Sequence, residues 1–330
     1  MSIKFTNPQD GERFSLNEQV TFQGISSNDI ATIKLLAEGK WLLGESAVTS
    51  NSWSVRYKFN RLGQRQIIVK GFDAAAQELA QAEISINIQA PLITCDQRNE
   101  LFTVGENSVW QISGQSAFFY KSEMQIDADG APNAYHPKDI GIDFLDNAGE
   151  VGNWWALVTD TGESDGEPLI QQPGDPFPGF YISTTTLEDS NKEISDPFRY
   201  VDASKIPYVV LPGNSSVQTT GVQLGDYAAV FNGNNNKIAF AIYADVGNPD
   251  QLGEGSTALS QALGHNPFVG SKVKTGISNN ILYVIFPGSR KPTNQWSSNE
   301  SADDIAEAAK LHFDAWGGIA RIQACFEELK

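Results

Sequence analysis

The sequence has few of the residues that bind metals or carry redox chemistry. Its 330 residues include two cysteines, Cys95 and Cys325, and three histidines, His136, His265 and His312. The cysteines form no CxxC pair, so either one disulfide or two buried free thiols fits them. The histidines share no metal-ligand spacing, and HExxH, P-loop and dinucleotide-binding motifs are missing. Zinc proteases and nucleotide-dependent enzymes are therefore disfavoured, and we expect no metal and no cofactor.

Long hydrophobic runs are also missing. No apolar stretch approaches the roughly 20 residues of a membrane-spanning helix, so we expect no membrane span. Residues 1–6 lack the apolar region and the cleavage site of a signal peptide. The sequence fits either a cytoplasmic protein or a chain that begins after a removed leader.

Basic residues are scarce in one part of the chain. The protein has 23 Lys and Arg against 40 Asp and Glu, which gives a net charge of -17. Residues 1–90 hold nine of each sign, so the whole acidic excess lies in residues 91–330. An acidic domain repels nucleic acid and anionic membranes and attracts cations, although the same excess also favours solubility. We therefore expect no nucleic-acid partner.

Short alternating strands predict a β-sandwich over residues 1–90. Turn residues separate the strands at intervals of about ten residues, a pattern typical of an immunoglobulin-sized sandwich. The predicted strands are 20–24, 32–37, 53–57, 66–72 and 82–88. The opening segment, residues 3–11, resembles the entry strand and turn of bacterial immunoglobulin-like modules. Trp41 and Trp53 either form a sugar-stacking face or pack in the core and at the edge of the sandwich. We expect this domain to act as a spacer or to bind weakly.

Residues 91–330 predict a second domain that is rich in strands and loops. The predicted strands are 154–158, 179–183, 208–212, 227–231 and 281–286. A cap at residues 299–301, apolar residues at helical spacing and Gly317-Gly318 predict a C-terminal helix, with further helix over 320–329. The fold class is therefore mainly β: an N-terminal immunoglobulin-like β-sandwich plus a β-barrel-like domain with a C-terminal helix.

Two carboxylates follow one apolar run. Residues 238–243 predict a buried strand that delivers Asp245 at its end, and Glu254 lies between two glycines after a Gly/Pro/Asn loop. A strand end and a glycine-flanked turn hold side chains in fixed places with open access. Cleavage of a glycosidic bond by acid and base needs two carboxylates held in this way. The alternative is that Asp245 is an ordinary turn residue and Glu254 a solvated loop charge.

A second acidic cluster lies in residues 121–137. Asp127 and Asp129 alternate with Ile126 and Ala128, so both point to one face of an extended segment. The Asp-x-Asp-Gly spacing does not fit an EF-hand calcium loop, which needs glycine at its sixth position, whereas Gly130 comes fourth. The segment predicts either a turn or the acidic wall of a cleft that binds a cationic sugar.

Five segments in order resemble the fungal-type chitosanases of glycoside hydrolase family 75. They cover roughly residues 115–287 and are 121–137, 174–185, 199–212, 225–230, and 244–247 with 253–256. The resemblance implies endo-acting, inverting hydrolysis of β-1,4-linked glucosamine chains (chitosan) by an Asp and a Glu, which match Asp245 and Glu254. We expect Asp245 to be the general acid and Glu254 the general base.

The expected substrate is a cationic polysaccharide, which the acidic domain would attract. The residues expected to bind it are Asp127, Asp129, Lys121, Tyr135, Tyr181 and Trp154, with the aromatic rings as sugar platforms. Trp154 and its neighbour Trp155 are expected to place at least one ring in the core.

The chain departs from the fungal pattern in three ways. It has no visible leader, it carries the added sandwich, and the loop after Asp245 contains Asn248-Pro249 where the family has proline directly after the glycine. These features suggest a bacterial relative and leave its polymer open. Separately, we expect a monomer, and only the resemblance favours secretion. The alternatives are an enzyme that cleaves peptidoglycan or another glycan with the same aspartate, and a non-catalytic glycan-binding protein.

Overall fold

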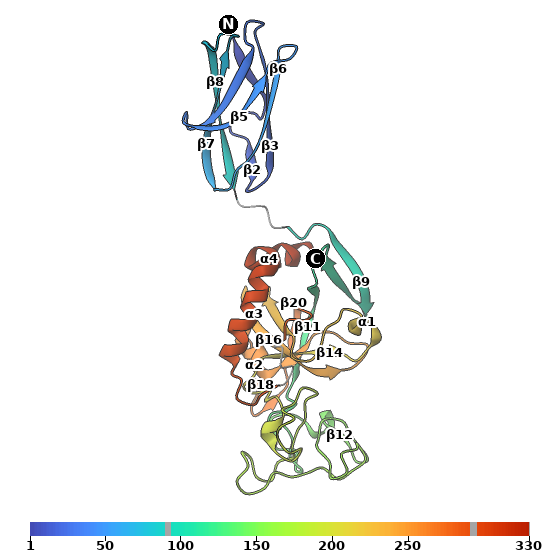
Figure 1. The fold of residues 1–330 in the computed structure, drawn as a ribbon. Helices are drawn as coiled ribbons and strands as arrows, with labels where there is room; N and C mark the ends of the chain where they lie inside the picture. The colour runs from blue at the N-terminus through green and yellow to red at the C-terminus, as the bar shows by residue number, and fades with distance from the viewer. Residues whose placement is uncertain (90–93, 291–295, 330) are drawn as a thin grey trace. The chain divides into compact units, whose positions relative to one another are not determined.

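The computed structural model describes residues 1–89, 94–290 and 296–329. The chain divides into two compact units, Met1–Leu92 and Ile93–Lys330 (Figure 1). The predicted domain boundary between residues 90 and 91 lies outside the described residues. Each unit has hydrophobic clusters of its own, so the two are described separately.

The N-terminal unit is a sandwich of two β-sheets. The first sheet has the order β1 (Ile3–Asn7), β3 (Gln19–Ser26), β6 (Ser52–Lys58). The second has the order β2 (Arg13–Ser15), β8 (Glu78–Gln89), β7 (Gly63–Phe72), β4 (Thr32–Ala37), β5 (Trp41–Ala47). Alternate residues of β3, such as Val20 and Phe22, are buried in one core with residues of the other sheet. The predicted immunoglobulin-like β-sandwich is confirmed.

The two tryptophans of this unit have different environments. Trp53 is 3% exposed and its ring packs edge-on against Phe5, with the ring centroids 5.3 Å apart. Trp41, the first residue of β5, is 70% exposed. The two rings therefore do not form one sugar-stacking face, because only Trp41 reaches solvent.

A closed six-stranded β-barrel forms the centre of the second unit. Around the barrel the strands are β11 (Phe118–Asp127), β17 (Glu254–Ser256), β14 (Tyr208–Pro212), β16 (Lys237–Gly247), β15 (Tyr227–Asn232) and β20 (Ile277–Ile285). The barrel closes because β11 pairs with both β20 and β17. Residues on the two faces of the strands belong to separate clusters: Tyr120 stacks on Tyr283 in one, and Phe119 contacts Trp316 in the other. The predicted barrel-like fold is confirmed.

Two C-terminal helices pack against the barrel (Figure 1). They are α3 (Ala302–Trp316), which packs on β15 and β16, and α4 (Gly318–Glu328), which packs on β20. Ser301, within the predicted cap, accepts a hydrogen bond from the Asp304 N–H, and the Asp304 side chain accepts one from the Ser301 N–H. Gly317, with φ of 128°, ends α3. The predicted C-terminal helix is confirmed.

A disulfide joins Cys95 to Cys325 in α4, 230 residues later. Cys95 precedes β9 (Arg98–Val104) and β10 (Asn107–Ile112), which extend the sheet beyond β11. The sequence left a disulfide and two free thiols open, and the structure has the disulfide. It ties the start of the unit to its last helix and restricts the unfolded chain.

Residues between β11 and β14 form an irregular region. Its short elements are η1 (Leu145–Asn147), β12 (Gly149–Glu150), β13 (Asn153–Trp154) and η2 (Pro197–Arg199). The strands predicted at 154–158 and 179–183 are wrong: single bridges such as Leu157–Ser183 replace them. Frequent Gly, Pro and Asp residues in this region favour turns over long strands.

The remaining short elements are α1 (Ser215–Gln218), α2 (Thr257–Ala262), β18 (Phe268–Val269) and β19 (Lys272–Val273). Within the described parts of the chain, no helix has the length and apolar character needed to cross a membrane.

Candidate active site

The barrel brings carboxylates from three strands together. Asp127 is the last residue of β11, Asp245 lies near the end of β16, and Glu254 begins β17. In the strand register, Glu254 pairs with Gln125 of β11 on one side and with Val210 of β14 on the other. Val210 also pairs with Asp245. The strand order β11, β17, β14, β16 therefore carries all three carboxylates across one edge of the barrel.

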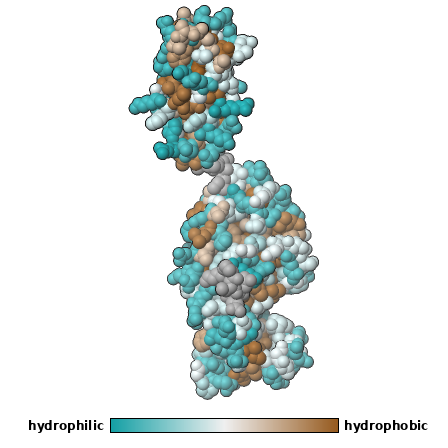
Figure 2. Space-filling view, in the orientation of Figure 1, coloured by the Kyte–Doolittle hydropathy of each residue, from teal (hydrophilic) through white to brown (hydrophobic). Residues whose placement is uncertain are grey.

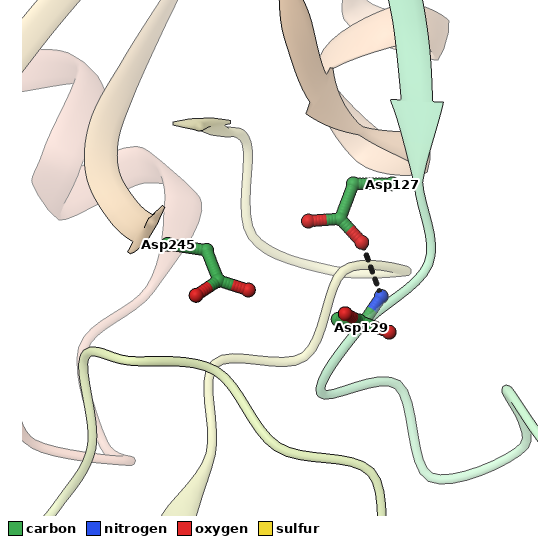
Figure 3. Close-up of side chains that lie close together, drawn as sticks. All are labelled: Asp127, Asp129 and Asp245. Carbon is green, nitrogen blue, oxygen red and sulfur yellow. Dashed lines mark hydrogen bonds between the residues drawn. The ribbon is translucent and has the colours of Figure 1, made fainter. Parts of the chain in front are cut away.

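Asp129, two residues beyond β11, completes the group. One carboxylate oxygen from each of Asp127, Asp129 and Asp245 lies within 4.8 Å of the others. Figure 3 shows these three side chains converging, with the Asp129 N–H donating to Asp127 Oδ1 at 2.7 Å. Glu254 belongs to the same electrostatic group, since its charge raises the pKa of Asp127 and Asp129.

Asp245 is held by three donors on one oxygen. The Thr186 N–H donates to Asp245 Oδ1 at 2.9 Å, and the Thr186 hydroxyl donates to the same oxygen at 2.5 Å. The Val246 N–H donates to it at 2.8 Å. This arrangement fixes the carboxylate and favours its ionised form.

Glu254 needs glycine beside it. A Cβ on Gly247 would lie 3.0 Å from Glu254 Oε2 and 2.8 Å from the Val210 side chain. Gly253, directly before Glu254, has φ of 93°, and a Cβ there would lie 2.3 Å from the Glu123 carbonyl oxygen. The two glycines thus make room for the glutamate and for its entry into β17.

Two buried tyrosines support Asp129. The Tyr135 hydroxyl donates to Asp129 Oδ1 at 2.6 Å and lies 3.4 Å from Asp143 Oδ2. The Tyr208 hydroxyl donates to the Asp129 backbone carbonyl at 3.0 Å. Both tyrosines are at most 1% exposed, so they support Asp129 from the protein interior.

Burial raises the pKa of all four carboxyl groups. For Asp127 and Asp129, burial and the neighbouring carboxylates raise the pKa well above its ordinary value. Burial raises the pKa of Asp245, while the hydrogen bonds from Thr186 and Val246 oppose that shift. For Glu254, burial and the charges of Asp245 and Asp143 raise the pKa to about 7. Glu254 is therefore able to carry a proton near neutral pH.

Carboxylate oxygens at this spacing are of the kind that bind hard cations. In this cluster, however, Oδ1 of Asp127, Oδ1 of Asp129 and Oδ1 of Asp245 each accept a hydrogen bond from a protein donor. Hydrogen bonds within the protein thus occupy one oxygen of each side chain.

Two cavities open near the strands that carry the carboxylates, although none of the four carboxylates lines either of them. One has a volume of about 620 Å³ and is lined by residues that include Gln125, Asp143 and Lys274. The other has a volume of about 580 Å³, and three acidic residues line it: Glu106, Glu123 and Asp250. Glu123, Gln125 and Ser278 line both cavities, and Gln125 is the β11 partner of Glu254.

The structure gives three predicted binding residues other surroundings. Tyr135 and Trp154 are buried, at 1% and 8% exposure, so neither ring offers a platform to a sugar. Of the neighbouring tryptophans Trp155 is the exposed one, at 58%. The Lys121 ammonium lies 4.3 Å from the centre of the Phe326 ring in α4 and not among the carboxylates of the β11 end. Tyr181 is half-buried beside Trp154, with the ring centroids 6.4 Å apart.

Four residues of the site carried no prediction from the sequence. Thr186 and Tyr208 are hydrogen-bonding supports, Gly247 gives space, and Asp143 adds charge. Tyr208 lies in the segment 199–212 that resembles family 75, so the resemblance could have pointed to it. Thr186 offered none, because its contact with Asp245 spans 59 residues.

Comparison with known families identifies the chain. The family model described as "Fungal chitosanase of glycosyl hydrolase group 75" matches residues 124–312, which is more than half of the 330 residues. The protein is therefore a glycoside hydrolase. It belongs to glycoside hydrolase family 75, and the matched range contains all four carboxylates.

Other comparisons give weak similarity. No curated protein matches the chain. Fibronectin(III)-like modules of Clostridium thermocellum CbhA are 17% identical over 27% of this chain and 96% of theirs, with a TM-score of 0.24. The endo-β-1,4-mannanase of Thermotoga petrophila is 12% identical over 27% of this chain and 20% of its own, with a TM-score of 0.23. A putative glycoside hydrolase of Bacteroides vulgatus is 6% identical over 39% of this chain and 24% of its own, with a TM-score of 0.17.

Proposed function

We propose that the protein is an endo-acting, inverting hydrolase of β-1,4-linked glucosamine polymers, with Asp245 and Glu254 as its acid–base pair. The observation that carries the proposal is the meeting of Asp245, Glu254, Asp127 and Asp129 at one barrel edge in a family 75 chain. An inverting enzyme holds its two carboxyl groups roughly 6.5–9.5 Å apart so that a water molecule fits between one of them and the sugar.

In this proposal Asp245 is the general base and Glu254 the general acid, which is the reverse of the roles expected from the sequence. Asp245 receives three hydrogen bonds on Oδ1, which suits a carboxylate that accepts a proton from water. Glu254, with a pKa raised to about 7, suits the group that carries a proton at working pH. Glu254 would protonate the glycosidic oxygen as the C1–O bond breaks. Asp245 would remove a proton from the water that attacks C1 from the opposite face.

The charge around the site supports a cationic substrate. Glu106, Glu123 and Asp250 line the second cavity, which is near the end of β11, and among the described residues no Lys or Arg lines it. Glucosamine chains carry ammonium groups when protonated, so an acidic cleft concentrates and orients them. Asp129 is the candidate for direct contact with such an amine, whereas Asp127 is 7% exposed and is better placed to hold Asp129.

The test is hydrolysis of glucosamine hexamers by the wild type and by two variants, Asp245→Asn and Glu254→Gln. Both substitutions keep the size of the side chain and remove its proton chemistry. Each should lower kcat by at least about 100-fold, the scale expected when a general acid or base is lost. Binding of the hexamer should remain measurable. Glu150→Gln, an exposed position in β12, is the matched control and should keep wild-type activity.

Product analysis separates the alternatives. Proton NMR of fresh product should show the α-anomer first, since inversion of a β-linkage gives that configuration. Added salt should raise KM for glucosamine chains because it screens their attraction to the acidic cleft. Equal activity on N-acetylated hexamers without salt dependence would favour a peptidoglycan-type enzyme. Binding without release of reducing ends would favour a non-catalytic glycan-binding protein.

A further inference from the structure

The N-terminal unit has an open pocket of its own. It has a volume of about 440 Å³ and lies between β5 and β6, the edge strands of the two sheets. Its lining includes Trp41 and Leu43 of β5, Tyr57 of β6, and Phe59, which directly follows β6. Figure 2 shows hydrophobic residues among hydrophilic ones on the visible surface of this unit.

The exposure of Trp41 sets this pocket apart from ordinary core packing. Phe59 is 6% exposed and closes the bottom, whereas Trp41 is 70% exposed and stands at the rim. Concave apolar hollows with a few polar groups at their edge are typical of small-molecule binding sites, and the exposed ring adds a contact surface to this one. The flat face of such a ring covers the apolar face of a sugar ring at little entropic cost.

Polar groups surround the apolar floor. Asn60 and Arg61 follow β6, and Arg65 and Glu38 complete the lining. Arg65 donates to the backbone carbonyls of Arg61 and Leu62, which fixes the turn. Among the described residues, the Arg61 side chain makes no salt bridge. The pocket therefore offers free donors at its edge.

The charges of the lining select among sugars. Two arginines against one glutamate repel the ammonium group of a glucosamine unit. An N-acetylglucosamine unit has no such charge, and its acetamido group offers a carbonyl to the donors and a methyl group to the apolar floor. The two units of the chain thus suit the two kinds of sugar found in one partly acetylated polymer.

The geometry points to a second glycan-binding site, in which the pocket of Trp41, Leu43, Tyr57, Phe59 and Arg61 binds N-acetylglucosamine units of a polymer whose glucosamine units enter the catalytic site. The inference rests on the proposed function for the identity of the polymer. Two linked sites on one chain raise the effective concentration of the enzyme at its substrate.

The test uses the full-length protein and insoluble, fully acetylated chitin as the binding probe. Trp41→Ala should weaken retention on chitin by about 10-fold, the scale of losing an aromatic anchor. Trp41→Phe should restore most of it. Ile25→Ala, at a 42% exposed position of β3 in the same unit, is the matched control and should bind as the wild type does. Circular dichroism checks that each variant is folded.

A charge-reversing substitution tests whether the pocket prefers N-acetylglucosamine units to glucosamine units. Arg61→Glu should weaken binding to chitin and strengthen binding to deacetylated polymer. Hydrolysis of short glucosamine oligomers should be unchanged in every one of these variants, so a failure of the catalytic proposal is seen separately. Unchanged chitin retention in Trp41→Ala would overturn the inference. A second result would also overturn it: if Trp41→Ala weakened binding to cellulose as much as binding to chitin, the pocket would not recognise the acetamido group, because cellulose is a neutral glucan without one.

Discussion

Asp245 and Glu254 are both partly buried carboxylic acids, yet they hold their protons differently. Burial raises the pKa of both, but three protein donors on Oδ1 oppose the shift at Asp245, whereas neighbouring negative charges add to it at Glu254. Hydrogen bonds to a carboxylate stabilise its charge, and burial beside other carboxylates does the opposite. Pairs of acids whose environments differ in this way are able to divide the roles of acid and base.

Thr186 controls this difference, which leads to a prediction about Thr186→Val. The variant loses the hydroxyl donor and keeps the backbone donor and a similar shape. The pKa of Asp245 should rise, so the acidic limb of the kcat profile should move to higher pH, and kcat at its optimum should fall by about 10-fold. KM should change little. Thr186→Ser keeps the hydroxyl and should restore the profile, while an acidic limb that stays in place in Thr186→Val would contradict the role of this contact.

The raised pKa of Glu254 predicts a pH-dependent cost to stability. Its pKa is about 7 in the folded protein against an ordinary value of 4.5. A carboxyl group with a raised folded pKa binds its proton more tightly in the folded state. Its stabilising contribution is therefore complete below pH 4.5 and is lost as the pH rises through about 7.

Glu254→Gln removes this dependence. Relative to the wild type, the variant should gain unfolding free energy between pH 5 and pH 8, by at most about 3 kcal/mol, because each pKa unit corresponds to about 1.4 kcal/mol. Urea unfolding at the two pH values measures the difference. Glu150→Gln, at an exposed position, should show no such gain. An equal pH response in the wild type and Glu254→Gln would show that the proton resides elsewhere in the cluster.

At the scale of elements, the strands were the predictable part. Alternation along β3, β4 and β6 and the apolar run of β16 identify strands from local sequence alone, and Ser301 with Asp304 marks the start of α3. Asp127, Asp129, Asp245 and Glu254 could also be singled out, because each lies at a strand end or between glycines. The edge strand β5 was missed, since its alternation is weak and most of it is exposed.

The contacts between elements could not be predicted in this way. The position of Thr186 against Asp245 depends on the backbone hydrogen bond from Leu187 to Ala244, and that of Gly247 against Glu254 depends on the pairing of β14 with β16 and β17. No local pattern encodes either contact. The region between β11 and β14 follows its turns and single bridges rather than strand propensity. The sequence predicts that Trp154 or Trp155 has its ring in the core, and only the packing of that region shows that Trp154 is the buried one and that Tyr135 is buried as well.

At the scale of the whole molecule, the chain combines a neutral unit with an acidic one. Residues 1–90 carry equal numbers of acidic and basic groups, and the excess of -17 lies in the rest. All four carboxylates, their supporting tyrosines and the two cavities lined by Glu123 and Gln125 belong to the second unit. The first unit has a separate core and a pocket whose lining includes two arginines. This division suggests that catalysis and attachment to the polymer reside in different units.

Deleting residues 1–89 tests whether catalysis and attachment to the polymer reside in different units. The truncated enzyme keeps every residue that we assign to bond cleavage, so kcat and KM on glucosamine hexamers should stay within about twofold of the full-length values, as expected for units with independent cores. Its activity on insoluble, partly acetylated polymer should fall by about 10-fold or more, because the gain in effective concentration from the second site is lost. Reducing-end assays on both substrates, with circular dichroism to check folding, make the comparison.

A folded truncation that loses activity on soluble hexamers would mean that the first unit helps to build the catalytic site. Undiminished activity on the insoluble polymer would mean instead that the pocket of Trp41 does not attach the enzyme to its substrate.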